Sequence, residues 1–353
     1  MDNAGTYLVP DFYRTFQCKC GECRISCCEG WDVGVSQDEY FRLIGLDTTD
    51  ALRARIQRGF YIPKDATPER YAVLNHDWLG RCPMRSEDGL CALQTEMGES
   101  VLPSICRLFP RSIREDLGEA TLSNSCERII ELLIERPNPI RFETTVLPKA
   151  VTGSELPDRM ALRMQCIGLL QDRSSTFKES ISAVGGLICG GLGNETASFA
   201  ERLEVMRSFL KLYAEISPSL TEYCENALLA FQDIDETGFR RRYDTLCIMF
   251  PDFNLTQENM MVNHFFYEKF PYSETREDEA EEFVSLCGLI GFLDVITVGN
   301  VERIGNREAM VDLLSHSFRM IEHTSFHYNA HVLLKEYGYD DPSKALTLTH
   351  LYD

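Results

Sequence analysis

Cysteines crowd the first third of the chain at a spacing dense enough for chemistry. Five of them fall within CKCGECRISCCEGW, residues 18–31, and nine of the fourteen lie in the first 126 residues. Free cysteine normally occurs as a scattered, buried, small apolar residue. A cluster this dense is more often a metal or iron–sulfur site, or a disulfide knot.

The chain begins MDNAGTYLVPDFYRTF, which has no basic segment followed by an apolar run, so we expect no secretory signal. A cytoplasmic, reducing location is therefore expected, where structural disulfides are rare. Soft thiolates favour zinc or iron–sulfur clusters, and either a tetrahedral zinc or a 4Fe–4S cluster needs four of them. Metal binding is the favoured interpretation, with iron–sulfur first, zinc as the alternative and packed thiols as the remaining one.

The candidate metal ligands form two groups along the chain, with Cys20 left out. The first group is Cys18, Cys23, Cys27 and Cys28, and the second is Cys82, Cys91, Cys106 and Cys126. Adjacent residues do not point the same way in regular structure. One site could therefore draw on both groups, with one of Cys27 and Cys28 as a ligand while its neighbour packs or binds a second metal.

The net charge of −20 indicates which partners suit the chain. Non-specific binding to nucleic acid depends on Lys and Arg, so we expect no nucleic-acid partner. A basic or lysine-bearing partner fits this charge, as does solubility alone. The longest apolar stretch, residues 283–296, is too short to span a bilayer and predicts a buried helix, so no membrane partner is expected.

Three regions must position these residues, and their patterns predict a mainly α fold. Residues 1–136 are rich in turns and form an irregular, cysteine-rich metal-binding domain, with a capping box of Ser36 and Glu39 opening a helix. Residues 137–157 contain several prolines and predict a linker. Residues 158–353 predict an α-helical domain with almost no strand pattern. Its expected helices are 158–171, 199–213, 220–231, 239–249, one from 256 to near 271, 282–297 and 307–336.

Several of these segments together resemble the FliB family, the flagellin lysine-N-methylases. The matching pieces are FQC with EC and CCEGW (residues 16–31), RCPMRSEDGLCALQTEMG (81–98), LPSICRLFPR (102–111), SNSCERIIELLI (123–134), ENMMVNHFFYEKFPY (258–272) and IEH (321–323). The resemblance implies methyl transfer from S-adenosylmethionine to lysine ε-amines of flagellin, a protein of the bacterial flagellum. It also implies that Cys20 is extra to the cysteine pattern.

The distal motifs supply the candidate catalytic residues, which are Glu258, Asn263, Tyr267, Glu322 and His323. A lysine amine has a reference pKa of about 10.4, so it must lose a proton before it can attack a methyl sulfonium. His323 could accept that proton with help from Glu322. The other three lie near one helical face, where a structural hydrogen-bonding stripe is the alternative interpretation.

The binding site of the methyl donor is not indicated by the sequence. No GxGxxG follows a strand, and the one glycine-rich run, residues 185–193, favours a turn or a helix-packing face. The competing function is a non-catalytic metal protein, such as a metal carrier or a redox-sensing adaptor. The helical half favours the enzyme, because a chelating module would not need polar positions set among aromatic residues.

Overall fold

The computed structural model describes residues 4–30, 32–78, 80–148, 157–272 and 278–351. Its contacts divide the chain into two compact units. The cysteine unit is Gln17–Arg111, and the helical unit is formed by the segments on either side of it. The last residue of the first cysteine motif, at position 31, lies outside the described residues.

This division differs from the domain boundaries expected from the sequence, 1–136, 137–157 and 158–353. The difference arises because β1 (Gly5–Pro10) pairs antiparallel with β7 (Phe142–Leu147) and parallel with β6 (Glu119–Leu122). These pairings join the start of the chain and the segment after residue 111 to the helical unit. The expected linker therefore contains a strand, and its residues 149–156 lie outside the described part of the chain.

The cysteine unit is a small sheet surrounded by short helices. Its strands are β2 (Gly34–Val35), β4 (Ala72–Leu74) and β3 (Phe60–Tyr61), in that spatial order. Its helices are α1 (Gln37–Ile44), α2 (Asp50–Arg58), α3 (Ala92–Met97) and α4 (Ser104–Leu108), with 3-10 turns at Cys20–Glu22 and Glu99–Val101. The predicted capping box of Ser36 and Glu39 is present at the start of α1. Its Glu39 carboxylate also accepts hydrogen bonds from Ser104 at the start of α4.

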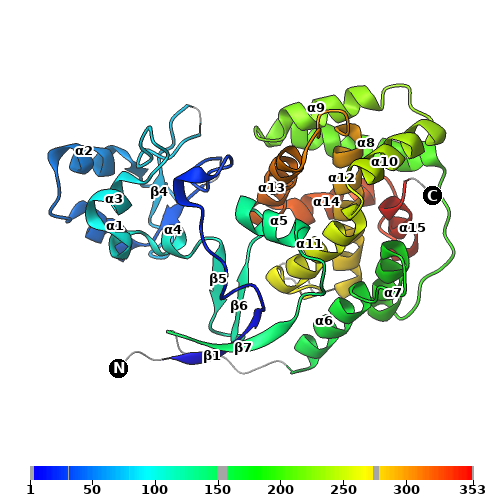
Figure 1. Cartoon of the computed structure of the whole chain (residues 1–353), viewed down its shortest axis with the longest axis horizontal. Helices are drawn as coiled ribbons and strands as arrows, with labels where there is room; N and C mark the ends of the chain where they lie inside the picture. Colours follow the sequence, from blue (N-terminus) through cyan, green and yellow to red (C-terminus); the bar gives the residue numbers. More distant parts are fainter. Residues whose placement is uncertain (1–3, 31, 79, 149–156, 273–277, 352–353) are drawn as a thin grey trace. The chain divides into compact units, whose positions relative to one another are not determined.

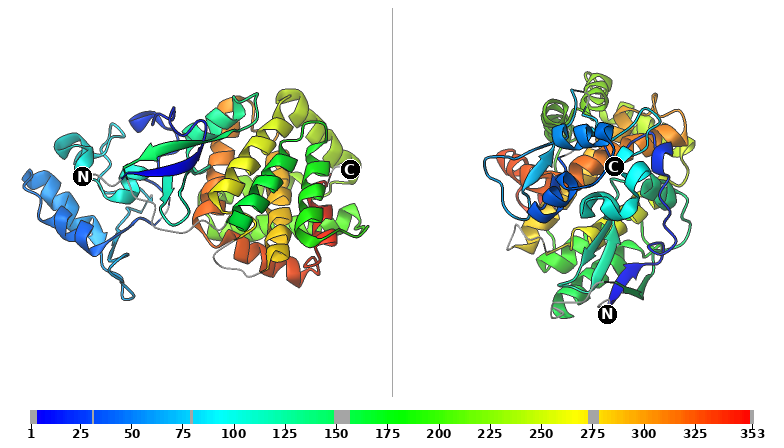
Figure 2. Two further views of the ribbon diagram at one scale, coloured as in Figure 1. Left: turned by 90° about the horizontal axis from the view of Figure 1, so that it is seen from below. Right: turned by 90° about the vertical axis from the view of Figure 1, so that its left-hand side faces the viewer.

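The helical unit confirms the mainly α prediction. A four-stranded sheet, in the order β5 (Arg111–Arg114), β6, β1 and β7, lies at one edge of a group of closely packed helices (Figures 1 and 2). The helices before the long central one are α5 (Glu127–Ile134), α6 (Pro157–Leu170), α7 (Phe177–Cys189), α8 (Phe199–Ile216), α9 (Thr221–Ala230), α10 (Glu236–Met249) and α11 (Phe253–Tyr267). The rest are α12 (Glu279–Gly299), α13 (Arg307–His323), α14 (Phe326–Glu336) and α15 (Pro342–Leu346), followed by a 3-10 turn at Thr347–Thr349.

The centre of this unit is α12, which Figure 1 shows among α8, α10 and α14. It packs against α7, α8, α9, α13, α14 and α15, and every residue from Glu282 to Gly299 is buried. By length and composition alone α12 could cross a membrane, but its whole apolar window is buried inside the unit. It therefore has the burial of a core helix, as the sequence predicted for residues 283–296.

The glycine-rich run of residues 185–193 splits between a helix and its end. Gly185 lies inside α7, where an added Cβ would collide with the Phe283 ring of α12. Gly190 ends the helix in the left-handed region, at φ 69°. The run therefore serves helix packing and chain reversal, as the sequence favoured.

The single long helix expected over residues 307–336 is broken in two. α13 ends at His323, Thr324 is extended, and α14 begins at Phe326. Because of this break, His323 and His327 do not lie one turn apart on a continuous helix.

Candidate functional site

Three of the motifs that carry the family resemblance meet inside the helical unit. The SNSC segment follows β6, and its Asn124 donates a hydrogen bond to the Met260 carbonyl of α11 (3.0 Å). Asn263 of α11 donates in return to the Asn124 side chain (2.6 Å) and to the Leu122 carbonyl (2.8 Å). These buried amides fix α11 against β6.

The third motif, IEH at the end of α13, joins this contact through Glu322. One carboxylate oxygen accepts a hydrogen bond from Ser123 (2.6 Å), and the other lies 3.1 Å from His264 Nδ1 on α11. The Ser123 hydroxyl is 2.5 Å from that of Ser125, which lies 2.8 Å from His323 Nε2. A continuous chain of polar contacts therefore runs from His264 to His323.

A pocket of about 810 Å³ opens beside this network, within the helical unit. It is bounded by the turn after β5, the end of α11, the start of α12 and the α13–α14 junction. We call it the acidic pocket, because its walls carry five carboxyl side chains and two basic ones. Its charged and imidazole residues are Arg114, Glu115, Asp116, His264, Glu268, Lys269, Glu282, Glu322 and His327.

Burial changes the proton affinity of two side chains in the acidic pocket. It raises the pKa of Glu268 to about 7, with Glu322 adding to the rise and His264 and Arg114 opposing it. It also raises the pKa of Tyr267 above its ordinary value. Glu268 can therefore gain or lose a proton near neutral pH.

Arg114 is held at the pocket wall by buried partners. Its guanidinium donates to the Phe266 carbonyl (2.9 Å) and lies 5.8 Å from the centre of the Tyr267 ring. It also pairs with Glu119 of β6 (3.7 Å), whose other oxygen accepts a hydrogen bond from Arg163 of α6. Burial lowers the pKa of Arg114, and the charge of Glu119 opposes this change.

The structure separates the five predicted catalytic residues. Tyr267 and Glu322 line the acidic pocket, whereas His323 belongs to the hydrogen-bonded network and is absent from the pocket wall. Asn263 is committed to main-chain and side-chain partners that hold α11 in place. Glu258 accepts hydrogen bonds from Arg173 (3.1 and 3.2 Å) away from the pocket. For Asn263 and Glu258, these contacts match the structural alternative considered for the polar stripe.

Sequence reasoning missed several residues of this pocket, notably His264, Glu268, Glu282 and Arg114. One signal was present, since His264 on α11 and Glu268, the residue that follows this helix, are four positions apart and flank Tyr267. Residues at that spacing share a helical face. The contributions of Arg114 and Glu282 depend on the tertiary fold and had no local signal.

In the cysteine unit, four thiols from separate segments become neighbours. Cys28, Cys82, Cys91 and Cys106 are close enough to affect one another's ionisation. Burial raises the pKa of Cys82 to about 12, whereas Cys106 is exposed. The main chain also links two of them, through a hydrogen bond from the Cys82 amide to the Cys28 carbonyl (2.8 Å).

Beside this four-thiol cluster, four other ligands were predicted: Cys18, Cys23, Cys27 and Cys126. Cys18 and Cys27 are exposed, and Cys23 is half-buried. Cys126 belongs to the helical unit, where it caps α5. Among the described residues, no three His, Cys, Asp or Glu side chains are grouped closely enough to hold a metal ion. The metal and the eight-cysteine ligand set therefore remain predictions.

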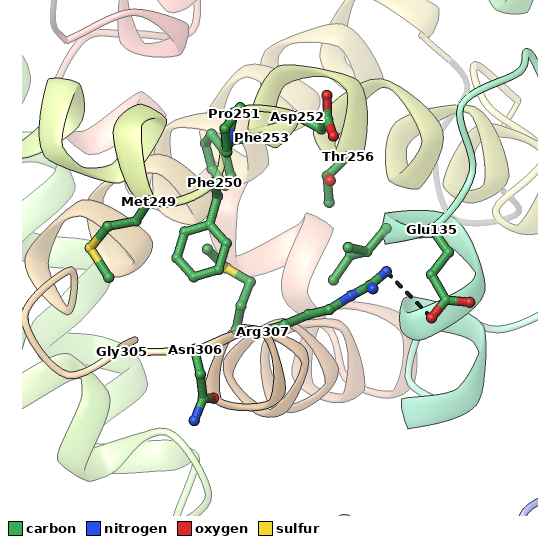
Figure 3. Close-up of a pocket in the computed structure, with 12 residues that line it drawn as sticks. Glu135, Met249, Phe250, Pro251, Asp252, Phe253, Thr256, Gly305, Asn306 and Arg307 are labelled. Atoms are coloured by element: carbon green, nitrogen blue, oxygen red, sulfur yellow. Dashed lines mark ion pairs between the residues drawn. The ribbon is translucent and has the colours of Figure 1, made fainter.

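A second pocket, of about 590 Å³, touches the opposite end of α11 (Figure 3). Its walls include Met249, Phe250 and Met310, and Arg307 reaches across toward Glu135 to form an ion pair of 3.4 Å. None of the predicted site residues lines it.

Comparison with known proteins finds a family model and several relatives that are similar to the distal half. Residues 190–348 match the FliB lysine N-methylase C-terminal domain. The lysine-N-methylases of Salmonella choleraesuis and Salmonella typhimurium are 24% and 25% identical to 51% of this chain, which covers 46% of their length. The flagellar biosynthetic protein FliU of Salmonella muenchen is 26% identical over 38% of this chain and 79% of its own. No solved structure matches.

The helical unit therefore contains a segment similar to the FliB lysine N-methylase C-terminal domain. These similarities to FliB lysine N-methylases confirm the resemblance stated from the sequence motifs. The chain spans about half the length of the curated relatives that it matches.

Proposed function

We propose that this protein is a protein lysine N-methylase and that the acidic pocket receives the substrate lysine. The observation that carries this proposal is the concentration of carboxylates there, with Glu268, Glu282 and Glu322 in one pocket of the matched C-terminal domain. A carboxylate-lined cavity suits an ammonium group because opposite charges attract strongly where water is partly excluded. The names of the relatives, lysine-N-methylase, support the same class of activity.

The proposed methyl donor is S-adenosylmethionine, and it shares the pocket with the lysine. Direct transfer requires the methyl carbon and the amine nitrogen to approach within about 3–3.5 Å. The second pocket cannot supply this approach, because its Thr256 lies eight residues before His264 on α11, roughly 12 Å along a helix. The aromatic rings of Tyr267, Phe270 and Tyr328 line the acidic pocket, where they could face a sulfonium cation.

The proposed substrate is flagellin, which this protein would methylate in the cytoplasm. The flagellar name of the FliU relative supports a flagellum-related substrate. The net charge of −20 suits a lysine-bearing protein partner.

The direct experiment incubates the purified full chain with S-adenosylmethionine and flagellin, followed by mass spectrometry of the flagellin lysines. We expect added methyl groups on lysine. The double variant Glu268→Gln and Glu282→Gln should raise the KM for flagellin, whereas Glu222→Gln, an exposed helical-unit residue outside the pocket, should not. If the wild-type protein is active and the double variant has an unchanged KM, the substrate lysine does not bind in this pocket. Methyl transfer to another lysine-bearing protein alone would exclude flagellin.

We further propose that the four-thiol cluster holds a metal, as an iron–sulfur centre or a zinc ion. The chemistry of the donor set supports this, since four thiols from distant segments lie near enough to influence one another and thiolates select these metals. Metal binding would have to draw these thiols closer together, because no three described side chains are yet grouped tightly enough to hold an ion. When bound, the metal would cross-link these segments and contribute folding free energy. Anaerobic purification with metal analysis and a visible absorption spectrum separates the two, because zinc-loaded protein is colourless.

Cysteine variants identify the ligands and also test the competing function. Cys106→Ser should lose the metal, whereas Cys189→Ser, a residue of the helical unit, should retain it. Equal loss from both variants would contradict the proposed cluster. Metal-loaded protein that binds but never methylates lysine-bearing proteins would favour the metal carrier or redox adaptor.

A further inference from the structure

His264 is held in a defined orientation at the wall of the acidic pocket. Its side chain is buried, and its Nδ1 lies 3.1 Å from the Glu322 carboxylate. The ring stacks on His327 at 5.5 Å, with the planes 14° apart, and lies 5.8 Å from the Phe318 ring. These contacts leave little freedom for the ring to rotate.

The other ring nitrogen of His264 is chemically available. Nε2 is buried and has no hydrogen-bond partner among the residues that the structure describes. A neutral imidazole that donates from Nδ1–H to a carboxylate carries its lone pair on Nε2. An unsatisfied buried nitrogen is costly, so its presence beside a pocket points to a ligand that supplies the missing partner.

We propose that the Glu322–His264 pair removes the proton from the substrate lysine ammonium before methyl transfer. This inference rests on the proposed methylase function. One N–H bond of the ammonium breaks, its electron pair stays on the lysine nitrogen, and the proton binds His264 Nε2. Glu322 stabilises the imidazolium that results. The amine lone pair then forms a bond to the donor methyl carbon, while the carbon–sulfur bond breaks and its electrons return to sulfur.

The serine network fixes the carboxylate that orients His264. Ser123 holds the second oxygen of Glu322, and Ser125 connects Ser123 to His323. His323 is therefore a positioning residue that acts through the serines. Burial lowers the pKa of His323, so the ring favours its neutral form.

The charge around His264 favours binding of a cation and proton transfer from it. Glu268 at the end of α11, Glu282 on α12 and Glu322 on α13 are negative when ionised, and Arg114 on β5 carries an opposing charge. The other titratable or charged groups lining the pocket are Glu115, Asp116, Tyr267, Lys269, His327 and Tyr328. Glu268 and Glu282 are assigned to hold the ammonium, and His264 to accept its proton.

The test compares His264→Gln with His316→Gln, a histidine of α13 that does not line the pocket, in the full chain with S-adenosylmethionine and flagellin. General-base catalysis typically contributes about 10²- to 10⁴-fold. We expect His264→Gln to lower kcat by that factor with little change in KM. Its rate should rise steadily toward pH 10, near the lysine pKa of about 10.4, because the lysine must then lose its proton to water. His316→Gln should keep the wild-type rate and pH profile.

A readout independent of activity is nitrogen NMR of the histidine rings. We expect neutral His264 to carry its proton on Nδ1 and to lose this preference in Glu322→Gln. If the wild-type protein is active and His264→Gln has the same rate, His264 is not the base. A proton found on Nε2 of neutral His264 would also overturn the proposed base. Either result would leave the methylase function unaffected. An inactive, folded and metal-loaded wild-type protein would instead overturn the methylase function on which the inference rests.

Discussion

Ser123 donates a hydrogen bond of 2.6 Å to Glu322, although 199 positions separate the two residues in the chain. The contact joins the segment before α5 to the end of α13 and places a carboxylate beside His264. Both side chains are buried, so the bond is a fixed part of the unit's interior. Two distant motifs therefore form one part of the site.

Removing this hydroxyl should destabilise the helical unit measurably. Ser123→Ala deprives the buried Glu322 carboxylate of a donor, and hydrogen bonds to charged groups contribute about 1.5–3 kcal/mol. We expect a loss of that size in the free energy of unfolding by urea. Ser208→Ala, which removes an exposed hydrogen bond to Tyr337, is the control and should cost about 0.5 kcal/mol or less. Equal losses in the two variants would show that the Ser123 bond is not special.

Replacing Glu119 should destabilise the helical unit more than Ser123→Ala does, because the Glu119 carboxylate lies between two arginines. Its carboxylate is fully buried and pairs with both Arg114 and Arg163. Glu119→Gln leaves two buried cations without their counter-charge, and breaking a buried pair in this way costs about 3–5 kcal/mol. We expect a large drop in the urea midpoint of the helical unit.

An exposed ion pair provides the matched control for Glu119. Glu222 pairs with Arg303 at 2.5 Å, but both side chains are about half or more exposed to water. Glu222→Gln should change the free energy of unfolding by less than about 1 kcal/mol. A comparable loss in both variants would contradict the importance assigned to burial.

Sequence patterns predicted what depends on local spacing. The apolar periodicity of residues 199–213 predicted α8, and the charge-poor run 283–296 predicted the buried α12. The pairing of β1 with β7 had no comparable signal, because it joins short strands more than 130 residues apart. The break at Thr324 was missed because apolar residues continue at helical spacing on both sides of it.

The same distinction applies to the site. Tyr267 and Glu322 were predicted from the family motifs, and both line the acidic pocket. Glu258 shares a helix with Tyr267 but accepts hydrogen bonds from Arg173, since the nine positions between them place the two side chains about half a turn apart. His264 sits in an almost wholly buried helix, where a histidine is usually structural. Its hydrogen-bond partner, the Glu322 carboxylate, comes from α13, so the pair forms only in the folded unit.

Asp294 should make stability depend on pH. It is buried in the middle of α12 and accepts one hydrogen bond, from Gln257 (2.6 Å), and burial raises its pKa to about 8. An aspartate in the unfolded chain has a pKa of about 3.9, so the folded protein holds one more proton than the unfolded chain between these two pH values. Stability attributable to this group must therefore fall as pH rises from about 4 to about 8.

The variant Asp294→Asn removes that dependence. The asparagine keeps an acceptor for Gln257 and places a donor near Gln257 Oε1, which has no partner among the described residues. We expect stabilisation by up to roughly 4 kcal/mol at pH 7 and almost none at pH 4, measured by denaturant unfolding at both values. Asp244→Asn, on the exposed face of α10, should change stability little at either pH. A pH-independent gain in Asp294→Asn would show that Asp294 is not protonated by burial.

Replacing each of two adjacent glycines of α7 by alanine should change the stability of the helical unit in opposite directions. An added Cβ at Gly185 would meet the Phe283 ring of α12 closer than van der Waals contact allows, whereas one at Gly186 meets nothing within 4 Å. Overpacking a core typically costs about 1–3 kcal/mol. Replacing an unhindered helical glycine by alanine stabilises by roughly 0.5–1 kcal/mol.

We therefore expect Gly185→Ala to lower the melting temperature and Gly186→Ala to raise it. Because both changes have the same helix propensity, the difference between them isolates the contact of α7 with α12. The combination of Gly185→Ala with Phe283→Leu should recover part of the loss, since the smaller side chain leaves room for the methyl group. Similar melting temperatures for the two alanine variants would mean that α7 does not pack on Phe283 through Gly185.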